Sequence, residues 1–168
     1  HHEVQAITFA LLWKSKNVFT HSQVQSEVQA SIIKGLGAEL ESGAVDEAEL
    51  INRYKRGVAR IPEALKDAPF FLENFVINEM FRENFPFEQS LPYENYLRLI
   101  IRFGLVRFML AIQCANENEL PSLKVLTQTV QSFCRRYQHD SQFAINVNNC
   151  FDNAGWADLQ KIFKFLKT

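Results

Sequence analysis

The segment from Tyr93 to Ala115 constrains the fold more than any other part of the sequence. Its apolar residues fall on every side of a helix and not on one stripe: Leu97, Leu99, Ile100, Ile101, Phe103, Leu105, Val106, Phe108, Met109 and Leu110. A helix that is apolar all round must be surrounded by other elements. Its most apolar part, residues 97–112, contains Arg102 and Arg107 and is shorter than the ~20 residues that a membrane span needs. We therefore predict a central buried helix and no membrane partner.

Helical periodicity recurs on both sides of this segment. Apolar spacings of three and four residues, capping residues and prolines predict further helices over residues 4–13, 22–36, 46–60, 67–84, 122–137, 140–150 and 156–165. Gly35 and Gly37 should end the second of these helices. Asp46 should cap the third, which should end before Ile61-Pro62, because a residue that precedes proline avoids the helical region. No alternating strand pattern is present. The prediction is an all-α fold, with seven to eight helices packed in one domain (1–168) around the central apolar helix at about 93–115.

Charge and cysteine content exclude several classes of protein. The chain has 168 residues with 18 Lys+Arg against 19 Asp+Glu, so no positive field exists to attract nucleic acid. Cys114, Cys134 and Cys150 are too far apart for a zinc site and too few for a disulfide framework. They are typical of reduced thiols in a cytoplasmic protein. We predict a cytoplasmic location, no nucleic-acid partner and no metal ligands.

Polar residues in the predicted helices offer few candidates for chemistry. The carboxylates Glu79 and Glu83 are one helical turn apart, and such pairs usually lie on a solvated face. Asn74 lies inside a helix, where an asparagine needs another partner, so we expect it to form an interhelical hydrogen bond. An arginine in an apolar helix, such as Arg102, should form an ion pair with a neighbouring helix.

A second polar group lies at the end of the sixth predicted helix. It consists of Arg135, Arg136 and His139, followed by Asp140. A histidine beside a carboxylate can transfer protons, but positive side chains at a helix C-terminus more often compensate its dipole. We name Arg135, Arg136 and His139 as candidate substrate-binding residues and assign no catalytic residue.

The segment from Phe71 to Phe87, FLENFVINEMFRENFPF, resembles a block of the FliB-type flagellin lysine-N-methylase family. In that block a Leu-x-Asn-aromatic helix leads to an aromatic-Pro stop. The helix from Tyr96 to Leu110 and the block Val130–Phe133 with its following histidine fit in the same order. The resemblance is good over roughly residues 65–145. The positions that match the family pattern are Asn74, Phe85, Pro86 and His139, and packing explains the first three.

This resemblance implies that the chain is the C-terminal helical fragment of a longer protein. Family members carry a cysteine-rich N-terminal half associated with an iron–sulfur cluster, and they transfer methyl groups from S-adenosylmethionine to lysine side chains of flagellin. The three cysteines here do not match that pattern, so we expect neither cofactor in this chain and no activity from it alone. The implied role is structural or substrate-binding, with flagellin and the N-terminal half as partners. Surface left uncovered by that half would also allow a homodimer.

The residues alone leave a second function open. The chain has 15 phenylalanines, which can line a pocket as well as fill a core. A non-enzymatic helical interaction or ligand-binding module, such as the effector domain of a regulator, would use them in this way. A helix-turn-helix encoded upstream would favour this alternative, whereas a cysteine cluster encoded upstream would favour the methylase.

Overall fold

The computed structural model describes residues 2–15, 23–37, 46–87, 92–116 and 118–137. These residues form six helices and no strand: α1 (His2–Ser15), α2 (Gln23–Leu36), α3 (Glu47–Ala64), α4 (Phe71–Arg82), α5 (Pro92–Cys114) and α6 (Leu123–Tyr137). The predicted all-α class is confirmed. The predicted number of seven to eight helices exceeds the six described, and the two helices expected over 140–150 and 156–165 lie outside the described residues.

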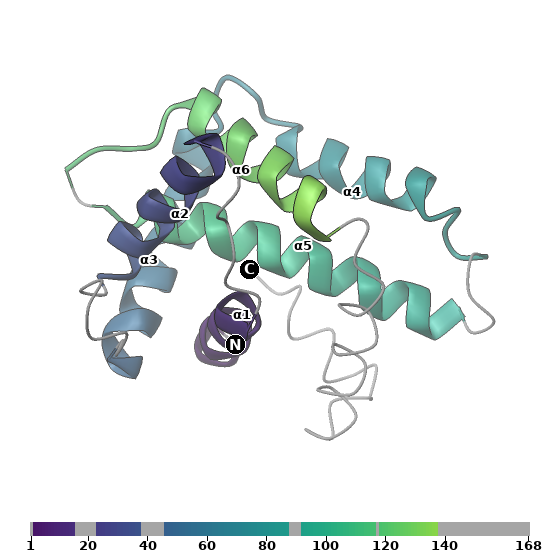
Figure 1. The fold of residues 1–168 in the computed structure, drawn as a ribbon, viewed down its shortest axis with the longest axis horizontal. Coiled ribbons are helices and arrows are strands. Elements are labelled where there is room, and N and C mark those ends of the chain that lie inside the picture. The colour runs from purple at the N-terminus through teal and green to yellow at the C-terminus, as the bar shows by residue number, and fades with distance from the viewer. Residues whose placement is uncertain (1, 16–22, 38–45, 88–91, 117, 138–168) are drawn as a thin grey trace.

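Helix α5 is the central helix, as its apolar circumference predicts. Every residue from Gly104 to Cys114 is buried. It contacts α1, α2, α3, α4 and α6, and Figure 1 shows it as the long helix against which the others pack. None of the described helices is both long enough and apolar enough to cross a membrane.

Three glycines allow neighbouring helices to approach α5 closely. A Cβ atom at Gly35 of α2 would collide with the backbone of Ile112, and one at Gly57 of α3 would collide with the backbone of Ala111. Gly104 of α5 leaves room for the ring of Phe9 in α1. Since a Cβ within 3 Å of backbone atoms forces the backbone to move, Gly35 and Gly57 fix the separations of α2 and α3 from α5.

Helix α3 does not end before Ile61-Pro62, so that prediction is wrong. The helix continues to Ala64, and the N–H of Leu65 bonds to the carbonyl of Ile61 at 2.9 Å. Ile61 and Leu65 are 7% and 6% exposed, so the last turn buries two large apolar side chains. This burial offsets the one backbone hydrogen bond that proline cannot donate. At the other end the predicted cap is confirmed, because Asp46 accepts a hydrogen bond from the N–H of Ala48 at 2.9 Å.

Candidate functional site

A groove of about 380 Å³ separates α4 from α6. The two helices both pack on α5 (Figure 1). Residues of both helices line the groove. Its lining comes from six residues of α4 and four of α6: Phe71, Asn74, Phe75, Asn78, Glu79, Arg82, Thr127, Val130, Gln131 and Cys134. Most of its lining surface is apolar. A groove of this size with a few polar groups has the character of a binding site.

Aromatic side chains form the base of the groove. Phe75 of α4 is buried and meets Phe133 of α6 edge to face, with ring centroids 6.0 Å apart. Phe133 in turn stacks on Tyr137 at 4.8 Å. The contact between Phe75 and Phe133 joins α4 to α6, whereas the stacking of Phe133 on Tyr137 lies within α6. Edge-to-face and offset-stacked rings favour a fixed geometry. The groove is therefore a surface feature above a packed interface.

Uncharged amide side chains lie along the rim. Asn74 and Asn78 of α4 are exposed, one helical turn apart, and Gln131 of α6 is exposed across from them. The interhelical hydrogen bond expected of Asn74 is not formed with any part of the chain that the structure describes. An amide side chain can both donate and accept hydrogen bonds. These three residues can therefore bind the peptide groups of another chain.

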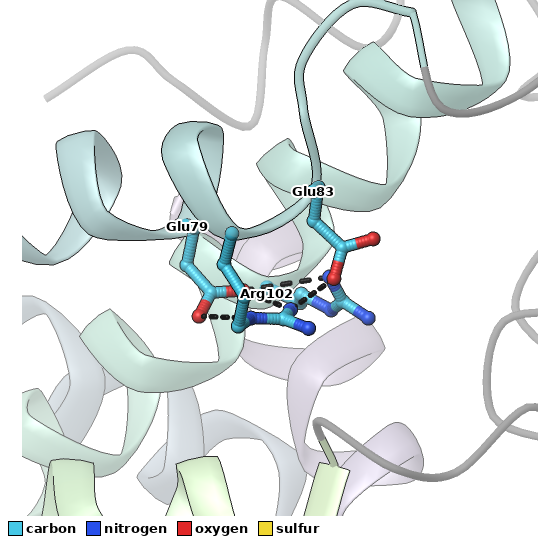
Figure 2. Close-up of polar contacts among 4 residues, drawn as sticks. Glu79, Glu83 and Arg102 are labelled. Carbon is cyan, nitrogen blue, oxygen red and sulfur yellow. Dashed lines mark hydrogen bonds and ion pairs between the residues drawn. The ribbon is translucent and has the colours of Figure 1, made fainter.

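Four charged side chains form a cluster at one end of the groove (Figure 2). Glu79 accepts a hydrogen bond from Nη2 of Arg82 at 2.8 Å and lies 3.4 Å from Nη1 of Arg102 on α5. Arg102 also lies 2.5 Å from Oε1 of Glu83, which pairs with Arg82 as well. The expected ion pair of Arg102 with a neighbouring helix is confirmed. The expectation of a solvated carboxylate pair is wrong, because Glu79 is only 2% exposed.

The sequence contains one signal for this cluster. Arg102 lies in an apolar helix and requires a carboxylate partner. The predicted helix over residues 67–84 contains four acidic residues, and the sequence does not show which of them pairs with Arg102: Asp67, Glu73, Glu79 and Glu83. Periodicity does not show which side of α4 faces α5. The buried position of Glu79 was therefore missed, and with it the groove residues Asn78 and Gln131.

Cysteine chemistry in the groove is suppressed. Burial, and then the negative charge of Glu79, raises the pKa of the Cys134 thiol. Burial also raises the pKa of Cys114 to about 11. Both are free thiols that stay protonated at neutral pH, so neither is an activated nucleophile.

The described residues do not fit an iron–sulfur cluster. Such a cluster needs about four cysteine ligands, whereas the described residues contain only Cys114, on α5, and Cys134, on α6. The described part of the chain also contains no group of three or more His, Cys, Asp or Glu side chains that could hold a metal ion. Cys150 lies outside the described residues.

Phe85 and Pro86, two of the family-pattern residues, join the end of α4 to α5. The N–H of Phe85 bonds to the carbonyl of Met80 at 2.9 Å, and the carbonyl of Pro86 accepts a hydrogen bond from Asn95 Nδ2 at 2.7 Å. The bond between Phe85 and Pro86 is cis. Both residues are half-buried, and their contacts hold the chain against α5.

The predicted polar group at the end of α6 lies apart from the groove lining. Arg135 is exposed and Arg136 is half-buried, both in the last turn of α6. Neither lines the groove. His139 lies outside the described residues, so the grouping of the three side chains stays a prediction.

Comparison with known families gives one match. The family model described as FliB lysine N-methylase C-terminal domain matches residues 1–165. Comparisons with curated proteins and with solved structures find no match. Since the match covers all six helices and extends nearly to the end of the chain, the chain belongs to the FliB lysine N-methylase C-terminal domain family.

Proposed function

We propose that this chain is the substrate-binding part of a flagellin lysine N-methylase and that the groove between α4 and α6 holds the flagellin chain. The observation that carries the proposal is the groove itself, with its apolar walls and amide rim. The α4 side of the groove comes from the segment that carries the family resemblance. Family membership favours this function over the effector domain of a regulator.

The side chains of the groove favour binding over catalysis. Methyl transfer to a lysine requires the neutral amine, and a general base commonly removes its proton. Glu79 is the only carboxylate among the groove-lining residues, and two guanidinium groups already engage it. Burial raises the pKa of the Cys134 thiol, which disfavours the thiolate that could act as a base. S-adenosylmethionine and an iron–sulfur cluster, which the family implies, would therefore bind to another part of the enzyme, and the isolated chain should not methylate flagellin.

The same proposal places the enzyme in the cytoplasm. Cys114 and Cys134 are free thiols, which persist in a reducing compartment. The N-terminal half implied by the family is the proposed partner that supplies the methyl donor.

The direct test is binding of monomeric flagellin to the chain, measured by isothermal titration calorimetry. Asn74→Arg places a long charged side chain at the groove rim and should weaken binding by about tenfold or more, a loss of about 1.4 kcal/mol. Asn52→Arg is the matched control, because Asn52 is exposed on α3 and does not line the groove. Both variants should keep the native melting temperature. If the native chain does not bind flagellin, the proposal is wrong.

The whole enzyme provides the second test. The full-length protein with its cofactors reconstituted should methylate flagellin lysines, detected by mass spectrometry, whereas residues 1–168 alone should not. Methyl transfer by the isolated chain would contradict the division of roles proposed here.

A further inference from the structure

We infer that the groove binds an uncharged, apolar stretch of flagellin and does not hold the ammonium group of the lysine that is methylated. This inference rests on the proposed function and specifies which part of the substrate the groove recognises. It follows from the charges, the walls and the surroundings of the groove.

The charges in the groove do not favour an ammonium group. A lysine that enters a partly buried site needs an available carboxylate to replace its hydration. Glu79 is 2% exposed and is neutralised by Arg82 at 2.8 Å and Arg102 at 3.4 Å. Arg82 also lines the groove, so an entering ammonium would meet a guanidinium of the same sign. With Glu83 included, two carboxylates balance two guanidinium groups and leave no net negative charge.

The walls and the rim match an uncharged peptide segment. Phe71 and Phe75 of α4 and Val130 of α6 supply apolar contact surface. Asn74 and Gln131 stand on opposite sides of the groove with amide groups that can pair with the N–H and C=O of a peptide bond. Apolar side chains of a partner would therefore lie in the groove while its backbone is hydrogen-bonded at the rim.

The apolar surface continues outside the groove on α4. Phe70, Ile77 and Phe81 are 64%, 40% and 82% exposed. Their spacing of seven and four residues places them on one side of the helix, next to the side that carries Asn74 and Asn78. Exposed apolar patches of this kind mark interaction surfaces. A bound segment that fills the groove can extend its apolar contacts onto this stripe.

Two substitutions at Gln131, one to a negative and one to a positive side chain, test the inference. The direction in which each changes the affinity for flagellin distinguishes an uncharged occupant of the groove from a lysine ammonium group. Gln131 is exposed in the free protein, so Gln131→Glu and Gln131→Lys should both fold with the native melting temperature. If the occupant is uncharged, both variants bury an unpaired charge and both weaken binding of monomeric flagellin, each by about tenfold. The matched controls are Asn52→Glu and Asn52→Lys on α3, which correct for the overall charge of flagellin.

The opposite outcome has a distinct pattern. If the groove holds the lysine ammonium, Gln131→Glu adds a carboxylate and strengthens binding, whereas Gln131→Lys weakens it. That result would overturn the inference, while flagellin binding by the native chain would still support the proposed function. Unchanged affinity in both variants would show that flagellin does not occupy the groove, and would overturn the inference together with the groove's part in the proposed function. Absence of binding by the native chain would instead refute the proposed function, and the inference with it.

Discussion

Replacement of Glu79 by glutamine tests whether the charge cluster holds α4 on the core. The substitution keeps the size of the side chain and removes the negative charge that lies between Arg82 and Arg102. Removing one member of a buried ion pair costs about 3–5 kcal/mol, because the remaining charge stays buried without compensation. Here Arg82 is about one-third exposed and can turn to solvent, and Arg102 keeps Glu83 at 2.5 Å. We therefore expect the lower end, about 3 kcal/mol.

Thermal unfolding followed by circular dichroism measures this loss. For a chain of this length about 1 kcal/mol corresponds to about 2–4 °C, so Glu79→Gln should lower the melting temperature by about 6–12 °C. Glu63→Gln is the control, because Glu63 is exposed near the end of α3 and its loss should change stability by less than about 0.5 kcal/mol. A Glu79→Gln protein as stable as the control would refute the view that this carboxylate is buried and paired.

Three further predictions concern the core and its titratable groups. Gly57→Ala should destabilise the chain by about 1–3 kcal/mol in urea unfolding, because the added Cβ would collide with the backbone of Ala111. Ala59→Gly, at an exposed position of the same helix, should also destabilise the chain, by about 1 kcal/mol, because glycine weakens a helix. A gain in stability for Gly57→Ala would show that α3 can move away from α5. Since burial raises the pKa of Cys114 to about 11, iodoacetamide at pH 8 should label it about 100-fold more slowly in the native chain than in urea, as read by peptide mass spectrometry, and equal rates would contradict its burial. Burial also raises the pKa of Tyr54 to about 12, so its neutral phenol contributes free energy of folding below about pH 10, and this contribution is lost as the pH rises to about 12. The urea midpoint of the native chain should therefore fall more steeply over this pH range than the midpoint of Tyr54→Phe. Parallel curves of midpoint against pH would disprove the shift.

The sequence predicted those parts of the fold that local pattern determines. The segment now seen as α5 was recognised because a helix apolar on all sides has only one stable environment, the interior. The cap at Asp46 was recognised because its carboxylate precedes a helix with acidic residues in its first turn. Gly37 was placed near the end of a helix, and it follows α2 with φ of 68°, a conformation that glycine adopts readily.

Long-range packing determined what the sequence did not predict. The burial of Ile61 and Leu65 keeps α3 helical through a proline, although local preference favours a break. Glu79 is buried because Arg102, 23 residues further along the chain, lies opposite it. The groove depends on the separation of α4 and α6, which no periodicity in either helix encodes. The candidate site could therefore be recognised only in three dimensions.

The kinetics of the full-length enzyme that contains this chain test the central claim most directly. The rate of flagellin lysine methylation, measured by mass spectrometry at several flagellin concentrations, gives kcat and KM separately. If the groove between α4 and α6 binds substrate and takes no part in methyl transfer, Asn74→Arg should raise KM by about tenfold and leave kcat within about twofold, while Asn52→Arg changes neither. An unchanged KM, or a fall in kcat at the native KM, would contradict the account.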